Sequence, residues 1–140
     1  MDCYYQRAWA TITKNKERIA LHKHQQSHIS FAYYLKKNKN DGTLNFWNEA
    51  AQNDLIPGLF KNVHLIKKNI FKTNIHNANF INFWPEVDEI YIFPSKSWHS
   101  TSHNETTEER ISISADISLV AKDSGNMEFT LTPINKWTKF

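Results

Sequence analysis

Three histidines of this sequence are spaced so that they could bind one metal ion. His22 and His24 are separated by a single residue within residues 18–26, which we expect to form a β-strand. Because successive side chains point to opposite faces of a strand, the two imidazoles would project from the same face. His99 follows a turn at Pro94 and could add a third nitrogen ligand from a distant part of the chain. Three ligands on one side of an ion would leave other coordination positions open for small molecules.

Neighbouring residues widen the set of candidates. Gln26 and His28 could lie on the same face as the first two histidines, and His103 follows on the loop of the third. We therefore treat Gln26, His28 and His103 as candidates for supporting the metal ligands through hydrogen bonds. Whether His28 replaces a neighbouring histidine as a ligand stays open, as does a carboxylate ligand from elsewhere. The ordinary alternative is a set of surface or core histidines, since close pairs arise by chance among seven.

An arginine lies on the polar face of a strongly alternating segment. Residues 110–119 place Ile, Ala and Leu side chains on one face and Arg110, Ser112, Ser114 and Asp116 on the other, which predicts a strand. A planar guanidinium binds a carboxylate through two parallel hydrogen bonds, which lysine cannot do. Only three of the 17 basic residues are arginine, so an arginine at this position is a candidate for carboxylate binding, although the residues alone favour an ordinary ion pair. The alternative is a surface ion pair with a nearby acidic side chain.

Two stretches resemble small Fe(II)/2-oxoglutarate-dependent oxygenases of the kind found in bacteria and tailed phages. Residues 93–100 read FPSKSWHS, with Arg110 eleven residues after the histidine, which is similar to the distal half of that family. Residues 22–35 read HKHQQSHISFAYYL and are similar to its His-x-His, Ser and aromatic-pair layout. The usual superfamily motif is His-x-Asp, so His24 stands where a carboxylate is expected. Phe31 stands where the family has glycine.

The resemblance implies a double-stranded β-helix, also called a jelly roll or cupin-like fold, with Fe(II) and 2-oxoglutarate as cofactor and cosubstrate. It implies that the three spaced histidines bind the iron and that Arg110 pairs with the distal carboxylate of 2-oxoglutarate. Ser112 shares the strand face of Arg110, and Tyr34 has the parity of the first two histidines, so both could add hydroxyl hydrogen bonds.

The implied activity is that of a dioxygenase that hydroxylates a C–H bond while 2-oxoglutarate is decarboxylated. The substrate stays open among peptide, nucleobase, sugar and small metabolite, because the loops that select substrates vary most. The partner that the resemblance implies is a small-molecule cosubstrate.

Two other classes of function also fit the residues. The first is a cupin-like metalloprotein that does not use 2-oxoglutarate, since the histidine pair and the segment from Pro94 to His99 resemble the two cupin motifs, with Lys96 in place of a glycine. The second is a non-catalytic jelly-roll binding or virion-associated module that has lost the metal. The oxygenase requires the side chain of Arg110 in the pocket, with Ser112 beside it. The binding module predicts that the three histidines do not converge.

Many short apolar runs between turns, with no long amphipathic helix, predict an all-β sandwich or barrel. Asp41-Gly42 predicts a hairpin between its two flanking strands. Residues 48–61 could contain a helical turn and are the least certain region. The expected strands cover residues 7–13, 18–26, 29–35, 43–47, 63–73, 75–84, 89–93, 110–119 and 127–132.

Composition predicts one domain over residues 1–140. The net charge of +3 is too small to indicate nucleic-acid binding, and Cys3 has no cysteine to pair with. No apolar run is long enough to span a membrane and no signal peptide is seen, so we expect a cytoplasmic protein, in a host cytoplasm if it comes from a phage. The apolar face of residues 111–119, with Trp137 and Phe140, could support a homodimer.

Overall fold

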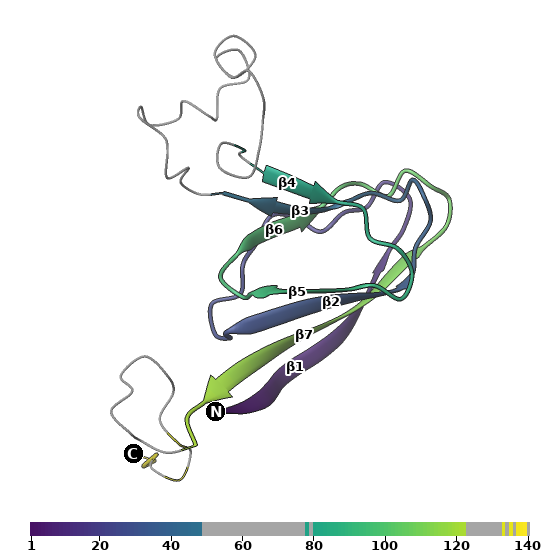
Figure 1. The fold of residues 1–140 in the computed structure, drawn as a ribbon. Coiled ribbons are helices and arrows are strands. Elements are labelled where there is room, and N and C mark those ends of the chain that lie inside the picture. Colours follow the sequence, from purple (N-terminus) through teal and green to yellow (C-terminus); the bar gives the residue numbers. More distant parts are fainter. Residues whose placement is uncertain (49–77, 79, 123–132, 134, 136, 140) are drawn as a thin grey trace, which may run out of the picture.

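The computed structural model describes residues 1–48, 78, 80–122, 133, 135 and 137–139. These residues contain seven β-strands, which form two antiparallel sheets lying one above the other (Figure 1). The prediction of an all-β protein is therefore confirmed. No helix in the described part of the chain is long and apolar enough to cross a membrane.

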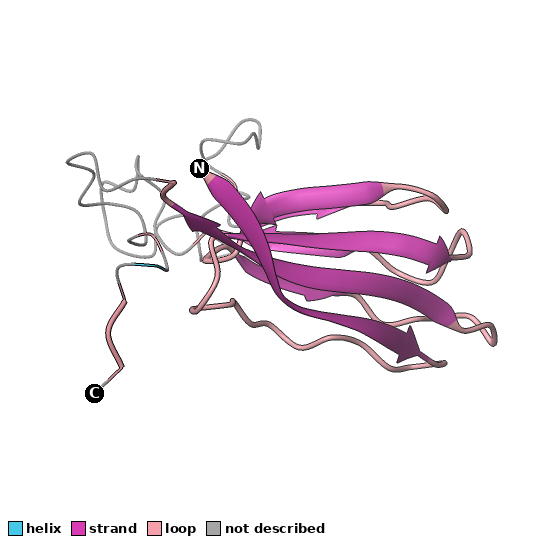
Figure 2. Cartoon of the chain, turned by 90° about the horizontal axis from the view of Figure 1, so that it is seen from below, coloured by secondary structure: helices cyan, strands magenta, loops and turns pink. Residues whose placement is uncertain are grey.

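The larger sheet carries the first and last strands of the described chain side by side (Figure 2). Its order is β1–β7–β2–β5, with β1 paired to β7 along its length and β2 paired to both β7 and β5. Its strands are β1 (Asp2–Thr13), β7 (Arg110–Val120), β2 (Ile29–Lys36) and β5 (Ile90–Pro94).

The smaller sheet has the order β4–β3–β6, with strands β4 (Phe80–Phe83), β3 (Leu44–Trp47) and β6 (Trp98–Thr101). From β2 onward the chain passes from the large sheet to β3 and β4, back to β5, across to β6 and back to β7. This winding between two facing sheets is the double-stranded β-helix that the resemblance implies. It places the loops and strands that carry the predicted site residues around one interior.

The expected hairpin at Asp41-Gly42 is wrong. β2 pairs with β5 and β7, whereas β3 pairs with β4 and β6, so the turn carries the chain from one sheet to the other. Gly42 has a φ of +103°, a backbone conformation that residues with a Cβ rarely adopt. The glycine was a correct signal for a turn, but a local turn motif does not reveal which strands pair.

Two predicted assignments around the histidines also differ from the structure. Residues 18–26 do not form a continuous strand; they run along β6 and share one isolated antiparallel bridge, between His22 and His99. His99 lies in β6, whereas the sequence placed it in a loop after the turn at Pro94. A strand as short and polar as β6 lacks the apolar alternation by which strands are found in a sequence.

Some predicted elements lie outside the described residues. These are the strands at 63–73 and 127–132, most of the strand at 75–84 apart from β4, the possible helical turn within 48–61 and the side chain of Phe140. Trp137 is described and is exposed.

The interior between the two sheets is unusually polar for a small domain. The largest side chains with less than 2% exposure are all polar, namely Asn104, Asp41, Asp116, Ser30 and Ser95. Large apolar side chains on the outer face of the large sheet, such as Ile92 and Ile113, are instead partly exposed. Buried polar groups cost free energy unless they are hydrogen-bonded, so this distribution indicates an interior built for a site rather than for stability alone. The homodimer expected from the apolar face stays a prediction.

A candidate metal and carboxylate site

The side chains of His22, His24 and His99 meet in the interior. One nitrogen from each lies within 4.8 Å of the other two. The ring centroids of His22 and His99 are 4.2 Å apart, and that of His24 lies 5.1 Å from His22 and 5.2 Å from His99. The sequence paired His22 with His24 through strand parity. In the structure, the bridge between His22 and His99 brings both of them to the third histidine.

Backbone hydrogen bonds fix this arrangement. The N–H of His22 donates to the carbonyl of His99 and the N–H of His99 donates to the carbonyl of His22, both at 2.9 Å. The N–H of His24 donates to the carbonyl of Ser95 at 2.8 Å, on the turn just before β6. The irregular segment is thereby attached at two points, so that its two imidazoles keep their positions relative to the third.

The outer nitrogen of each ring is bonded away from the cluster. Nδ1 of His22 lies 2.8 Å from the carbonyl oxygen of Ala20, and Nδ1 of His99 lies 2.8 Å from that of Ser97. A carbonyl oxygen only accepts, so each Nδ1 must carry the proton and donate it. The lone pair of each ring then lies on Nε2, which is the form in which imidazole binds a metal.

Burial also keeps the ring of His99 in its neutral form. His99 is 7% exposed and packs against Phe93, with ring centroids 4.8 Å apart. Burial, with a smaller contribution from the nearby rings of His22 and His24, lowers the pKa of His99 to about 4, against the opposing effects of the Ser97 carbonyl and Asp116. At neutral pH His99 is therefore uncharged, with its lone pair free for a ligand bond.

The histidines line one part of a small cavity between the sheets. The cavity has a volume of about 130 Å³, and its other walls include Tyr34, Thr101, Ser112 and Ser114. Pockets for drug-sized ligands are typically about 300–1,000 Å³, so this space suits only a small molecule. The lining is otherwise apolar and aromatic, and its hydroxyl groups can hydrogen-bond the oxygens of a small acid.

Arg110 does not itself line this cavity, although the oxygenase prediction required it to, but it contacts Thr101, which does. It is 3% exposed, and its Nη2 donates to the hydroxyl of Thr101 at 2.8 Å, while its Nη1 donates to the carbonyl of Asp41 at 2.5 Å. Two of the five N–H donors of the guanidinium are thus used by described residues. Burial lowers its pKa, but nearby Tyr34 and Asp41 oppose this effect. The surface ion pair considered as an alternative is wrong, because Arg110 is interior.

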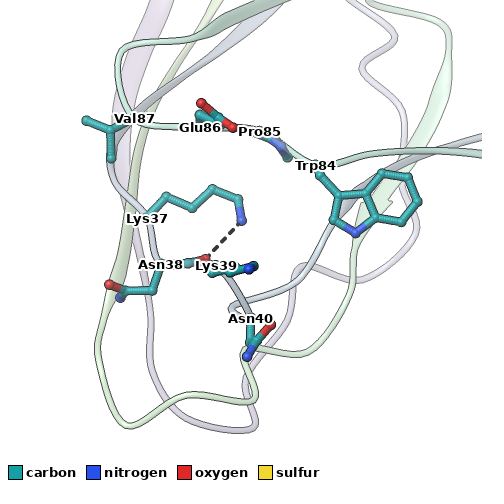
Figure 3. A pocket seen from close by; sticks show the side chains of 8 residues that line it. All are labelled: Lys37, Asn38, Lys39, Asn40, Trp84, Pro85, Glu86 and Val87. Carbon is teal, nitrogen blue, oxygen red and sulfur yellow. Dashed lines mark hydrogen bonds between the residues drawn. The ribbon is translucent and has the colours of Figure 1, made fainter.

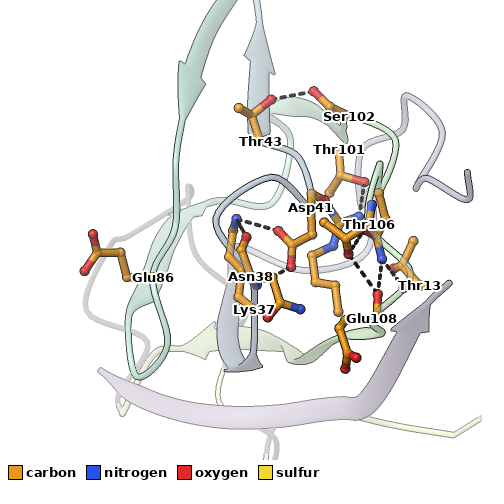
Figure 4. A network of polar contacts seen from close by, with 12 residues as sticks. Thr13, Lys37, Asn38, Asp41, Thr43, Glu86, Thr101, Ser102, Thr106 and Glu108 are labelled. Carbon is orange, nitrogen blue, oxygen red and sulfur yellow. Dashed lines mark hydrogen bonds and ion pairs between the residues drawn. The ribbon is translucent and has the colours of Figure 1, made fainter. Parts of the chain in front are cut away.

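A buried ion pair holds the turn that supports Arg110. Lys37 Nζ lies 2.5 Å from Asp41 Oδ1, with the two side chains 4% and 0% exposed, and the N–H of Asn38 donates to Asp41 Oδ2 at 2.7 Å (Figure 4). A Cβ added to Gly42 would lie 3.0 Å from Nη1 of Arg110 and 2.8 Å from the carbonyl oxygen of His103. The turn therefore fits closely around the guanidinium.

A larger hollow lies near the same turn and is separate from the histidine cluster. It has a volume of about 610 Å³ and is lined by Lys37–Asn40 on one side and Trp84–Val87 on the other (Figure 3). Lys37 Nζ lies 3.3 Å from the carbonyl of Asn38 there. None of the three histidines lines it, so the smaller cavity, with its convergent donors, is the better candidate site.

The two predicted hydroxyl donors both reach the smaller cavity. Ser112 and Tyr34 line it from β7 and β2, and these two residues are partners in the strand register. Tyr34 is 3% exposed, and burial raises the pKa of its phenol, an effect that the charge of Arg110 partly opposes. The phenol therefore stays protonated at neutral pH and can donate a hydrogen bond.

The three residues considered as supports for the ligands make no hydrogen bond to them within the part of the chain that the structure describes. Gln26 lines a surface pocket that His24 and Asp116 also line, and its main-chain carbonyl accepts a hydrogen bond from Gln6. His28 is exposed, and its Nδ1 accepts the N–H of Leu119 at 3.0 Å. His103 is exposed on the loop before β7. None of them is part of the cluster in the described structure.

Sequence reasoning missed the residue that contacts His24. Asp116 Oδ1 lies 2.5 Å from Nδ1 of His24, and the carboxylate also accepts hydrogen bonds from Ser30 at 2.6 Å and Arg7 at 2.7 Å. Burial raises the pKa of Asp116, but these three hydrogen bonds outweigh it and hold the pKa below its usual value. The alternation of β7 was the available signal, since Asp116 shares the face of Arg110.

The chain belongs to a family of oxygenases. The family model described as putative 2OG-Fe(II) oxygenase matches residues 7–116, which include all of the residues that form this site. The cofactors implied by this family are Fe(II) and 2-oxoglutarate, as the resemblance predicted. No curated protein sequence matches the chain significantly.

Solved structures share the fold. An oxidoreductase of the 2OG-Fe(II) oxygenase family from Burkholderia pseudomallei superposes with a TM-score of 0.60 at 11% identity, covering 84% of this chain and 45% of that one. The non-heme alpha-ketoglutarate-dependent epimerase SnoN of nogalamycin biosynthesis gives 0.54 at 15% identity, covering 82% and 48%. Iron-bound HygX from Streptomyces hygroscopicus gives 0.53 at 6% identity, covering 92% and 66%. The chain thus spans about half the length of the first two.

Proposed function

We propose that this chain is an Fe(II)/2-oxoglutarate-dependent dioxygenase that hydroxylates a substrate C–H bond. The observation that carries the proposal is one small cavity lined by three convergent imidazoles and by hydroxyl groups, of which that of Thr101 accepts a hydrogen bond from Arg110. The family supports Fe(II) and 2-oxoglutarate as the cofactor and cosubstrate of this chain.

The donor set fits the metal. Imidazole nitrogen is a suitable ligand for iron, and three such ligands on one side leave positions for a bidentate acid and oxygen. The set departs from the two-histidine, one-carboxylate arrangement common among non-heme Fe(II) oxygenases, because all three donors are neutral. His22, His24 and His99 would hold the ion through Nε2, and each ring is already oriented by the partner of its Nδ1.

Arg110 and two hydroxyl groups of the cavity lining fit the cosubstrate. Arg110 would bind the distal carboxylate of 2-oxoglutarate with N–H donors that Thr101 and Asp41 do not use. Tyr34 and Ser112 would donate hydroxyl hydrogen bonds beside it. The length of the acid would set its position between the guanidinium and the histidines. The protein's own part is thus to orient the acid and to keep water out of a cavity with little free volume.

Fe(II) and 2-oxoglutarate together supply the oxidation, in which dioxygen adds one oxygen atom to a substrate C–H bond and one to the succinate that forms with CO₂. The residues around them would hold and orient these groups. Their contribution is positioning and charge, which are the protein's usual part when a cofactor carries the difficult chemistry.

The proposal is tested by anaerobic titration of Fe(II) into the purified protein with and without 2-oxoglutarate. A visible charge-transfer band that requires both additions is the expected result, because the band arises only when the acid chelates bound iron. His99→Ala should abolish it, and His28→Ala, a matched exposed histidine, should leave it unchanged. Succinate formation on admission of oxygen then measures turnover.

Two other outcomes would point to the other functions. Iron binding without the band, and without any effect of Arg110→Ala, would favour a cupin-like metalloprotein that does not use 2-oxoglutarate. Absence of iron binding would leave a jelly-roll binding module. The second alternative expected that the three histidines would not converge, whereas their nitrogens lie within 4.8 Å of one another.

A further inference from the structure

The three histidines differ in what holds their outer nitrogen. Nδ1 of His22 and of His99 donates to a neutral backbone carbonyl. Nδ1 of His24 instead donates to a carboxylate, that of Asp116, at 2.5 Å, and the two side chains are 8% and 1% exposed. One ring of the site is therefore polarised by a full negative charge and the other two are not.

The carboxylate of Asp116 is held in place at both oxygens. Ser30 donates its hydroxyl to Oδ1 at 2.6 Å, and Arg7 donates Nε–H to Oδ2 at 2.7 Å. Ser30 is itself bonded to Ser95 at 2.8 Å, on the turn whose carbonyl holds the backbone of His24. Asp116 cannot rotate away from His24 without breaking these bonds, so the contact is a built part of the interior.

The position of this pair within the site is informative. His24 occupies the place at which the superfamily's His-x-Asp motif has its carboxylate ligand. The nearest buried carboxylate lies directly behind that ring, bonded to it. A hydrogen bond from a ligating imidazole to a carboxylate raises the basicity of the ring, and a buried, charge-assisted bond does so more strongly than one to a carbonyl.

We propose that Asp116 is the carboxylate of this metal centre, acting through the His24 ring instead of on the ion, and that it makes His24 the strongest donor of the three. The inference rests on the proposed function, because it assumes that a divalent ion binds the cluster. Asp116 is a positioning residue in this account, since it touches neither the ion nor the cosubstrate.

Arg7 allows a second test of the inference, in which the expected change in metal affinity has the opposite sign. Its side chain is 61% exposed, bonds Asp116 and lies over the ring of Trp9, with its guanidinium carbon 4.9 Å from the ring centroid. Because its positive charge offsets that of the carboxylate, removing it should strengthen the polarisation of His24. A purely structural role of Asp116 would predict the reverse, namely that losing either partner loosens the site.

The test is calorimetric titration of Co(II) into the protein. Co(II) reports on ligand strength without oxygen chemistry, and its ligand-field bands are visible. Asp116→Asn keeps the shape and an acceptor oxygen but removes the charge. We expect its Co(II) affinity to fall by about 10-fold, with loss toward 100-fold in Asp116→Ala, because removal of such partners typically costs that much. The ligand-field bands should shift in Asp116→Asn. Ser118→Ala, on the same face of β7, should match wild type.

Arg7→Gln should bind Co(II) more tightly than wild type and shift the bands in the direction opposite to Asp116→Asn. Because Arg7 is largely exposed, this variant tests the charge effect even if the Asp116 variants fold poorly. In a His24→Ala background, Asp116→Asn should have little further effect, since its influence passes through that ring.

Two results would overturn the inference. If wild type binds Co(II) but Asp116→Asn binds it equally with unshifted bands, Asp116 does not tune the centre, and the proposed function stands. If Arg7→Gln weakens binding as Asp116→Asn does, the network is structural only. Failure of wild type to bind any divalent ion would overturn the proposed function itself, and the inference with it.

Discussion

His22 and His99 exchange two backbone hydrogen bonds of 2.9 Å, and their rings lie 4.2 Å apart at the centroids. The two residues are far apart in the chain, and neither belongs to a long strand shared with the other. This single antiparallel bridge joins the two parts of the histidine cluster. The geometry of the candidate metal site is thus set by main-chain pairing, which side-chain substitutions on the ligands leave in place.

Loss of one imidazole should therefore remove a ligand without collapsing the fold. We expect His99→Ala to weaken Co(II) affinity by more than the about 10–100-fold typical of residues that only support a ligand. Isothermal titration measures this, and the far-ultraviolet circular dichroism of the metal-free variant should match that of wild type. Wild-type affinity in His99→Ala would show that the cluster is not the metal site.

Arg110→Lys should separate cosubstrate binding from metal binding. Lysine keeps the charge but lacks the planar fork, and hydrogen bonds to charged groups contribute about 1.5–3 kcal/mol each. We expect 2-oxoglutarate affinity to fall by that free energy per lost bond while Co(II) affinity is unchanged. The Co(II) spectrum gives both affinities: that for Co(II) is followed as Co(II) is added, and that for 2-oxoglutarate as a colourless diacid competes with the bound acid. An unchanged affinity for 2-oxoglutarate would show that the acid does not bind to Arg110.

The ion pair of Lys37 and Asp41 should matter more than its surface counterpart. Breaking a buried pair leaves one charge without a partner, so Lys37→Met should lower the free energy of unfolding by about 3–5 kcal/mol. Lys36→Met removes a pair with Glu108 that is 44% and 61% exposed at its two side chains, so it should cost only about 0–1 kcal/mol. Urea denaturation compares the two variants, and equal effects would contradict the buried pairing.

Gly42→Ala should disturb both stability and the cosubstrate end of the cavity. The glycine has a φ of +103°, and an added Cβ would lie 2.8 Å from the carbonyl oxygen of His103 and 3.0 Å from Nη1 of Arg110. We expect a loss of at least about 1 kcal/mol in unfolding free energy and weaker 2-oxoglutarate binding, since the guanidinium must shift. Thermal unfolding and the diacid competition check the two effects. A variant as stable as wild type would contradict the close fit.

Burial of Tyr34 should make the protein sensitive to alkali. Because its pKa is raised above the ordinary value of 10.0, the folded state keeps the phenol proton that the unfolded state releases. The stabilising contribution is complete below pH 10 and decreases as the pH rises further, since proton release then favours unfolding. Tyr34→Phe should remove this alkaline loss. Phenolate absorbance followed with circular dichroism should show the last tyrosine ionising together with unfolding.

The three histidines and Arg110 were selected as candidates from the sequence because their residue types are chemically specific and because the stretches around them resemble a known family. Asp116 was not, because an alternating strand shows two faces without showing which one is interior. Here the polar face of β7 is the buried one, and Ile113 on the apolar face is 37% exposed. The usual assumption that apolar residues mark the interior fails when the interior is a binding site.

The fold class was predictable from short apolar runs and turns, but pairing was not. Asp41-Gly42 has the local sequence of a hairpin, yet it is a crossing between sheets, because partner choice depends on strands distant in sequence. Lys37 and Asp41 likewise look like solvated charges at a turn. Only the burial of both side chains, which no local pattern encodes, shows that they support Arg110.

The pairing of β1 with β7 has a consequence for synthesis of the protein. Arg7 and Asp116 are 109 residues apart, and the carboxylate behind His24 reaches its place only when β7 joins the large sheet. At the usual rate of about 5–20 residues per second, a ribosome needs roughly 5 to 20 s between these two residues. During that interval the earlier histidines exist without the strand that completes their surroundings. The complete metal site can therefore form only after β7 has been synthesised and has paired with β1.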